Sequence, residues 1–191
     1  MDEKKIALDQ AAQHIFANNG YKHTNIAEIA KAANISVGSF YKFYNSKEEI
    51  FLQIYIKENE RIRKKVIDET DWQGDPIRIT LNIFEHLKKE LLNNKILSEW
   101  NNPKISSLLR DYYKSEEGVA NNNFHQFVLD YIQKYLLDSG FEAKEVQKIT
   151  RVYELIYHID CNVEDEAFPD KTEVLQTLLT YFIQGIIHHK A

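Results

Sequence analysis

IAEIAKAANISVGSFYKFYN, residues 26–45, is the stretch that decides the fold of this chain. Its apolar side chains stand where two short perpendicular helices would pack on each other, and they are Ile29, Ala33, Ile35, Phe40 and Phe43. Ala30 is small, so the second helix can cross the first at close range. Asn34 occupies the turn, where the backbone must be left-handed and asparagine is the most tolerant residue after glycine. The spacing predicts a helix-turn-helix, whose second helix can enter the major groove of DNA.

The second helix of this motif and its flanks carry residues suited to DNA contacts. Gly38 weakens a helix but lets the backbone come close to a duplex. Hydroxyl groups and lysines can reach phosphates, and the free N–H groups at helix starts favour the same anion. The predicted DNA-binding residues are Thr24, Asn25, Ser36, Val37, Gly38, Ser39, Tyr41, Lys42, Tyr44 and Lys47. The alternative is a helical protein that never binds DNA, in which Tyr41 and Tyr44 are ordinary half-buried tyrosines.

Helical periodicity covers nearly the whole chain, which has only 6 Gly and 3 Pro among 191 residues. We expect an all-α fold of about nine helices, at about residues 4–19, 26–33, 37–43, 47–70, 76–94, 103–114, 118–138, 143–162 and 171–188. Capping residues support several of these boundaries. Gly20 is expected to end the first helix, and the predicted N-caps are Thr24 or Asn25 (with Glu28 three residues after Asn25), Ser36, Ser46 (with Glu49) and Asp75.

The charge is unevenly distributed along the chain. The formal net charge of -5 argues against a nucleic-acid partner. Residues 1–50, however, hold six lysines and six acidic residues, so the remaining residues carry the whole excess. Cys161 is the only cysteine, which excludes an intrachain disulfide and fits a reducing compartment. The start MDEKKIALDQ has no apolar signal core, and no apolar run is long enough to span a bilayer, so a cytoplasmic protein is expected.

Residues 7–51 resemble the N-terminal domain of the TetR family of bacterial transcription regulators. The likeness is carried by AAQHIFANNGYKHT (11–24), IAEIAKAANIS (26–36) and VGSFYKFYNSKEEI (37–50). The characteristic run of the family is matched at Gly38, Phe40, Tyr41, Ser46, Lys47, Glu48 and Ile50. Three departures are Thr24-Asn25 for a pair of threonines, Asn34 for the turn glycine, and Phe43-Tyr44 for a His-Phe pair. The missing histidine removes one expected phosphate-side contact and leaves the fold unaffected.

The resemblance implies an all-α homodimer with two domains per subunit. A helix-turn-helix DNA-binding domain would occupy residues 1–46, and a helical ligand-binding and dimerisation domain residues 47–191. Such proteins mostly repress promoters and are released by a small molecule, so we expect a repressor on a near-palindromic double-stranded DNA operator, with no cofactor. The alternative is a helical ligand-binding or scaffold protein whose helix-turn-helix no longer reads DNA.

Two sites are predicted in the C-terminal part. Dimerisation is expected through about 143–162 and 171–188, because the last helix has a wide apolar band that includes Gly185; the alternative is that both helices are intrachain core. A pocket for a largely apolar effector is expected among Phe84, Trp100, Tyr113, Phe127, Tyr131, Tyr153 and Tyr157, with Leu87, Leu109 and Phe124 as further candidates. Possible polar anchors are His86, Glu99, Arg110, His125 and His158. Aromatic residues at helical spacing are, however, more often core.

The sequence does not predict catalysis. Cys161, His158 and Asp160 lie within one turn of a helix end, where their side chains fan outward and form no relay. His188 and His189 form an adjacent pair near the end of the chain, which is a poor metal site. No Walker loop, dinucleotide fingerprint or zinc spacing is present, so we expect neither an enzyme nor a metal site.

Overall fold

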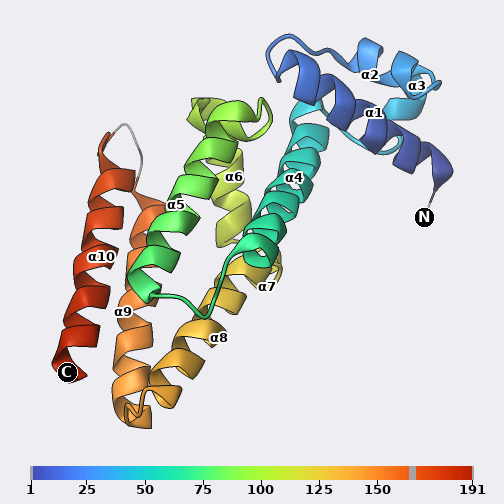
Figure 1. Cartoon of the computed structure of the whole chain (residues 1–191). Helices are drawn as coiled ribbons and strands as arrows, with labels where there is room; N and C mark the ends of the chain where they lie inside the picture. The colour runs from blue at the N-terminus through green and yellow to red at the C-terminus, as the bar shows by residue number, and fades with distance from the viewer. Residues whose placement is uncertain (1, 164–166, 191) are drawn as a thin grey trace. The chain divides into compact units, whose positions relative to one another are not determined.

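The computed structural model describes residues 2–163 and 167–190, and within them it contains helices and no strand. The prediction of an all-α fold is confirmed (Figure 1). The helices are α1 (Glu3–Asn19), α2 (Ile26–Ala32), α3 (Val37–Phe40), α4 (Lys47–Glu69), α5 (Pro76–Asn93), the 3-10 helix η1 (Leu97–Asn101), α6 (Pro103–Lys114), α7 (Glu116–Ala120), α8 (Asn123–Asp138), α9 (Ala143–Asn162) and α10 (Lys171–Lys190). No helix in the described residues is both long and apolar enough to cross a membrane.

Two predicted helices differ from the observed ones. The helix expected over 37–43 ends at Phe40, because the next amides turn back by three residues, as in the 3.2 Å bond from Lys42 N to the Ser39 carbonyl. The helix expected over 118–138 is divided into α7 and α8. Ser115 caps the first and Asn122 caps the second, so the chain starts a new helix at Asn123.

The chain packs into two compact units. The first consists of the residues up to 65 together with 87–111, and the second of 66–86 together with the residues from 112 onward. Helices α4, α5 and α6 each contribute residues to both units. The first unit therefore contains the predicted DNA-binding domain at residues 1–46, which we call the head, and also a later segment that includes η1.

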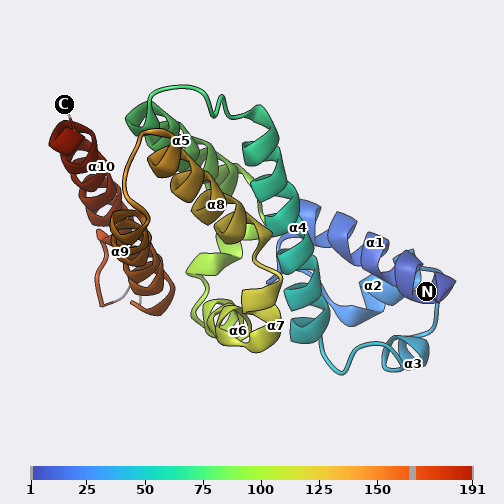
Figure 2. The same ribbon diagram turned by 90° about the horizontal axis from the view of Figure 1, so that it is seen from below.

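In the first unit, α2 packs against α1 and α3, and α1 contacts the start of α4 (Figures 1 and 2). Phe16 of α1, Phe40 of α3 and Phe51 of α4 are all fully buried. The rings of Phe16 and Phe51 meet edge to face with their centroids 4.9 Å apart, which favours one fixed packing over a loose apolar contact.

In the second unit, α8, α9 and α10 share an apolar cluster. Leu136, Phe141 and Val146 are buried at its centre, and Ile149 of α9 and Ile186 of α10 pack against it. Figures 1 and 2 both show α9 and α10 side by side, and their chain directions are opposite.

Candidate nucleic-acid interface

The turn between α2 and α3 is built on Asn34. Its φ of 54° is the only positive φ of a non-glycine residue in the part of the chain that the structure describes. The amide of Ile35 then bonds to the Ala30 carbonyl at 3.0 Å, and Asn34 N bonds to the Lys31 carbonyl at 3.1 Å. These bonds close the end of α2 in the way that a left-handed residue allows. The predicted left-handed turn is confirmed.

Side-chain caps fix the two helices of the motif. Asn25 accepts a hydrogen bond from the amide of Glu28 at 2.9 Å, and the Glu28 carboxylate accepts one from the amide of Asn25 at 3.2 Å. Ser36 Oγ accepts a bond from the amide of Ser39 at 3.1 Å. Both N-caps are as predicted, and they set where α2 and α3 begin.

Helix α3 and the turn after it present one open surface, which we call the recognition face and define as Val37, Gly38, Ser39, Tyr41 and Lys42. Val37 is 41% exposed and Tyr41 is 53% exposed, although both are large and partly apolar. Lys42 is also exposed. A Cβ on Gly38 would approach only Ser36 Oγ, at 3.8 Å. No internal packing therefore requires glycine at this position.

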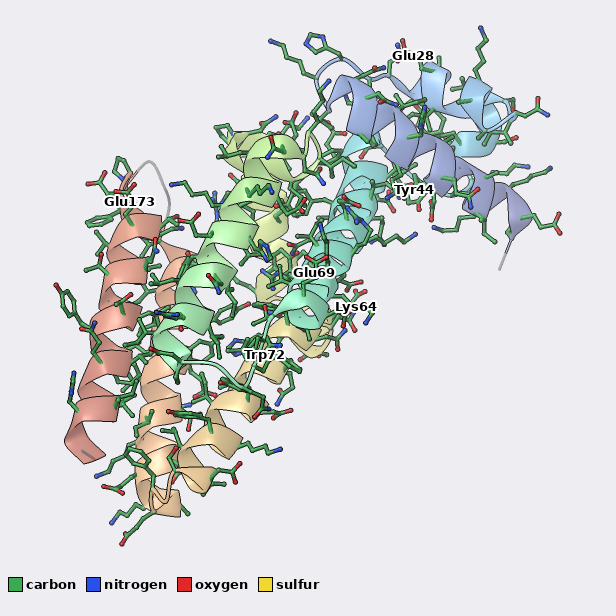
Figure 3. The ribbon with its side chains drawn as sticks, viewed as in Figure 1. Glu28, Tyr44, Lys64, Glu69, Trp72 and Glu173 are labelled. Atoms are coloured by element: carbon green, nitrogen blue, oxygen red, sulfur yellow. The ribbon has the colours of Figure 1, made fainter. Side chains whose placement is uncertain are left out.

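Two predicted DNA contacts lie inside the head. Tyr44 is 3% exposed, and its hydroxyl donates to Asp9 Oδ1 and accepts from Lys5 Nζ, both at 2.5 Å (Figure 3). Thr24 is also 3% exposed, and its hydroxyl donates to the Gly20 carbonyl at 2.8 Å. Both hydroxyls are used by the protein, so we reassign Tyr44 and Thr24 from the DNA surface to the frame of the head.

Lys47 belongs to the same frame. Its ammonium donates to the carbonyls of Tyr21 and Thr24, each at 2.9 Å, and lies 4.0 Å from the centre of the Tyr21 ring. It thereby holds the loop between α1 and α2 against the start of α4. We reassign this lysine from a phosphate contact to a support of the loop.

A charged network, absent from the predicted site, surrounds Tyr44. Asp9 Oδ2 lies 2.7 Å from Lys57 Nζ and 3.5 Å from Lys5 Nζ. Burial alone would raise the pKa of Asp9, but the hydrogen bonds from Lys57 and Tyr44 outweigh it and hold the pKa below its usual value. Burial and the bond to Asp9 together raise the pKa of Tyr44. The network joins α1, the loop before α4, and α4.

A second set of polar contacts ties the head to residues 94–104 of the same unit. Glu58, only 5% exposed, accepts from Asn94 Nδ2 at 2.6 Å and from Gln13 Nε2 at 3.3 Å, and it also pairs with Arg61. These contacts cross from α1 through α4 to the end of α5.

Three further contacts reach the same segment. Lys95 Nζ donates to the Asn18 carbonyl at 2.5 Å, and the Tyr21 amide donates to Glu99 at 3.3 Å. Glu48 accepts from Lys104 at 2.5 Å. That bond, together with one from Tyr21, lowers the pKa of Glu48 to about 2. Glu99, a predicted ligand anchor, is therefore engaged in holding the head.

The predicted ligand-binding aromatics fall into separate groups. In the second unit, the Trp72 ring lies 4.9 Å from Phe127 and 4.8 Å from Tyr131. His125 stacks on Tyr157 at 3.9 Å and on Tyr153 at 5.5 Å. Trp100 belongs to the first unit. Phe84 and Tyr113 are half-buried in the second unit.

Trp72 was not among the predicted site residues, because it lies in DWQGDP (71–76), between two predicted helices. Its indole N–H donates to the Ile67 carbonyl at 2.9 Å, which fixes the ring after the end of α4 (Figure 3). The Tyr131 hydroxyl beside it is buried and has no hydrogen-bond partner among the described residues. Burial is also the main cause that raises the pKa of Tyr131.

Residues 9–54, which contain the recognition face and its frame, match the model of the bacterial regulatory proteins of the tetR family. Residues 9–54 therefore form a domain of the TetR family. The chain is 34% identical over 104 residues to the uncharacterized HTH-type transcriptional regulator YhgD of Bacillus subtilis (strain 168), covering 52% of this chain and 53% of YhgD. It is 26% identical over 179 residues to the HTH-type transcriptional regulator QacR of Staphylococcus aureus, covering 92% of this chain and 80% of QacR.

A solved structure agrees with the fold of this chain. The structure of Thermus thermophilus FadR, a TetR-family transcriptional repressor in complex with lauroyl-CoA, aligns with a TM-score of 0.57 and 20% identity over 95% of this chain and 94% of that one. The likeness supports the helical fold of both units. The chain spans about half the length of YhgD and of the AcnR repressor of Corynebacterium jeikeium, two of the curated relatives it matches.

Proposed function

We propose that this chain is a TetR-family transcriptional regulator that binds a near-palindromic operator as a homodimer and represses the adjacent promoter. The observation that carries the proposal is the recognition face, where Val37, Tyr41 and Lys42 are exposed around Gly38. An exposed valine on a four-residue helix and an exposed tyrosine directly after that helix gain nothing for the isolated chain. They fit a surface that packs against bases and phosphates in a major groove.

The proposed domain organisation is a DNA-binding domain at residues 1–46 and a ligand-binding and dimerisation domain at 47–191. Exposed apolar residues on the last two helices support dimerisation there. They are Val152 and Leu155 on α9, and Val174, Leu178 and Tyr181 on α10. A repressor of this kind acts where the chromosome lies, so the proposal places the protein in the cytoplasm.

The proposed effector is a small molecule with a largely apolar body, bound in the second unit near Trp72, Phe127 and Tyr131. The buried Tyr131 hydroxyl has no partner among the described residues, and it would gain a hydrogen bond from a polar atom of the ligand. Helix α4 contributes residues to both units, so it can transmit a ligand-dependent shift to the head. The ligand acts only through its different affinities for the DNA-competent and released states.

Fluorescence anisotropy with labelled DNA from the region upstream of the chain's own gene tests the proposal. We expect binding that Tyr41→Ala weakens by about tenfold or more on every sequence tested, whereas Ser39→Ala changes which bases are preferred. Lys134→Ala, an exposed lysine on α8, is the matched control and should leave affinity unchanged. If the wild type binds this DNA no better than a random duplex, and Tyr41→Ala has no effect on either, the recognition face does not read DNA and the scaffold alternative is favoured.

The effector is tested separately from DNA binding. Lauroyl-CoA, the ligand in the Thermus FadR structure, is a suitable first apolar probe. We expect that an effector of this class releases labelled operator from the wild type, and that Tyr131→Phe needs about five- to tenfold more of it, since one hydrogen bond is lost. Release that is identical in the wild type and in Tyr131→Phe would remove Tyr131 from the effector site.

A further inference from the structure

Asp9 of α1 places a negative charge inside a domain that is proposed to bind DNA. Its side chain is only 13% exposed, and Lys57 Nζ lies 2.7 Å and Lys5 Nζ 3.5 Å from Oδ2, both within hydrogen-bonding distance. The Tyr44 hydroxyl donates to Oδ1 at 2.5 Å. Hydrogen bonds to a charged group are the stronger class, so they compete well with other partners of the same donors. Asp9 is thus the shared acceptor of two ammonium groups and one hydroxyl.

Lys5 is held in place from two sides. Besides its contact with Asp9, its ammonium donates to the Tyr44 hydroxyl at 2.5 Å and lies 4.5 Å from the centre of the Tyr44 ring. Lys4, the preceding residue, is exposed. A lysine stem is long and flexible, so its ammonium stays in water unless a partner compensates for the lost hydration. Asp9 supplies the negative charge for that compensation, because the ring and the hydroxyl of Tyr44 are neutral.

The position of Lys5 is close to the recognition face. The Phe40 ring lies 5.4 Å from the Tyr41 ring and 6.0 Å from the Tyr44 ring, measured between ring centres. The Tyr44 ring on which Lys5 lies is therefore separated from the exposed Tyr41 by the Phe40 ring. An ammonium released here would be attracted to a phosphate near Tyr41 whatever the base sequence, since the attraction is only partly screened over about 10 Å, the Debye length in 0.1 M salt.

Tyr44 also connects Asp9 to the end of α3. The Tyr44 amide donates to the carbonyl of Phe40, the last residue of α3, at 3.1 Å. Tyr44 is 3% exposed, so without Asp9 its hydroxyl would be a buried donor that has lost its acceptor, which is costly. The turn after α3 would move to relieve this cost, and the recognition face would move with it. Contacts to base edges need one placement of that face, whereas phosphate contacts carry no sequence information.

We propose that Asp9 is a positioning residue that sets the specificity of the head for its operator. It holds Lys5 off the phosphates, which every duplex offers, and it holds Tyr44 so that α3 keeps the placement that base contacts need. The inference rests on the DNA binding of the proposed function, and it adds a residue outside the recognition face that determines the ratio between the affinities for operator and for random DNA. A role in stability alone is different, because partial unfolding lowers both affinities by the same factor and leaves their ratio unchanged.

Fluorescence anisotropy with two labelled duplexes tests the proposal on the full chain. One is DNA from the region upstream of the chain's own gene, and the other is a random duplex of the same length. Asp9→Asn should tighten binding to the random duplex by about threefold or more and steepen its slope of log K against log salt by about 2 for a dimer, because each subunit releases Lys5. The ratio between the affinities for the two duplexes should fall by about tenfold or more.

Glu3→Gln and Lys5→Gln are the companion variants. Glu3 is an exposed acid on α1, so Glu3→Gln changes the net charge equally and should leave the slope and the ratio unchanged. Lys5→Gln should leave the slope of the otherwise wild-type chain unchanged, whether or not Asp9→Asn folds well, and it should cancel the steepening in Asp9→Asn. Acetylation without DNA, followed by mass spectrometry, should modify Lys5 more slowly than Lys4 in the wild type and at about the same rate in Asp9→Asn.

The possible outcomes separate this inference from the proposed function. Operator binding by the wild type, with the same ratio and slope in Asp9→Asn, overturns the inference and leaves the proposed function intact. A slope that becomes shallower in Lys5→Gln alone shows that Lys5 already contacts phosphate, and it overturns the inference in the same way. Equal acetylation rates of Lys4 and Lys5 in the wild type also overturn it. A wild type that binds neither duplex overturns both the inference and the proposed function.

Discussion

Asn34 holds the turn between α2 and α3 with a φ of 54°, a conformation that costs most side chains free energy. Asn34→Gly removes that cost and should leave the free energy of unfolding within about 0.5 kcal/mol of the wild type. Asn34→Val should lower it by about 1–2 kcal/mol, since a β-branched residue tolerates this backbone poorly. Urea unfolding measures both, and a valine variant as stable as the wild type would show that the turn is not left-handed in solution.

Tyr44 and Tyr41 make a matched pair of tyrosines three residues apart, one buried and one exposed. Tyr44→Phe deletes a hydroxyl that bonds Asp9 and Lys5, so it should lower the free energy of unfolding by about 1–2 kcal/mol. Tyr41→Phe should leave stability unchanged, because its ring is 53% exposed. Thermal unfolding compares the two variants. Equal stabilities would contradict the reassignment of Tyr44 to the frame.

The sequence predicts local features of the head well and long-range ones poorly. Asn25, Asn34 and Ser36 act on amides within five residues, so their roles follow from spacing alone. The burial of Tyr44 depends on Asp9, 35 residues earlier in the chain, and no local pattern indicates that contact. In the sequence, Lys47 looks like a free surface lysine for the same reason. Its carbonyl partners, Tyr21 and Thr24, lie in the loop between α1 and α2, far from it along the chain.

At the scale of helices, the errors of prediction arise where side-chain caps compete with periodicity. The apolar period runs on through residues 118–138, but Ser115 and Asn122 both cap, so two helices form. Residues 95–102 lie between two predicted helices, and Glu99 and Trp100 among them were predicted to take part in ligand binding. The segment 94–104 is joined to α1, to the loop that follows α1 and to α4 by Asn94, Lys95, Glu99 and Lys104.

Acid should loosen this connection between the head and residues 94–104. Glu48 has an ordinary carboxyl pKa near 4.5 when unfolded and a pKa of about 2 when folded, because Lys104 and Tyr21 bond its charged form. Between pH 2 and pH 4.5 the unfolded chain binds more protons than the folded chain. The contribution of the paired Glu48 to the free energy of unfolding is therefore complete above about pH 4.5 and is lost as the pH falls towards 2. The pKa of Glu58 is also lowered, and the hydrogen bond from Arg61 is the largest cause.

Glu48→Gln tests this pH dependence. The variant should be less stable than the wild type at pH 7, by no more than about 1 kcal/mol because the pair is partly solvated, and the difference should shrink as the pH falls below 4.5. Urea midpoints at a series of pH values measure it, with the exposed Glu60→Gln as control. A difference between variant and wild type that is constant with pH would mean that Glu48 is unpaired in solution.

For the whole molecule, net charge is a poor guide to the partner. The chain carries -5, and the head is neutral by sequence, yet its lysines are not equivalent. Lys5 and Lys47 are engaged inside the head, whereas Lys4, Lys22, Lys31 and Lys42 are exposed. Only the exposed set can neutralise phosphates, and which lysines belong to it could not be read from the sequence.

The number of exposed lysines in the head sets the salt dependence of operator binding. Each phosphate neutralised on B-DNA contributes about 0.9 to the slope of log K against log salt, so four exposed lysines per head allow a slope no steeper than about -7 for a dimer. Lys42→Ala should make the slope shallower by about 2, because each dimer loses two charges, while Lys47→Ala should lower stability and leave the slope unchanged. Anisotropy titrations between 50 and 300 mM salt, an ordinary range for such assays, measure all three proteins. A slope that responds to Lys47→Ala and not to Lys42→Ala would return Lys47 to the DNA surface and remove the recognition face from it.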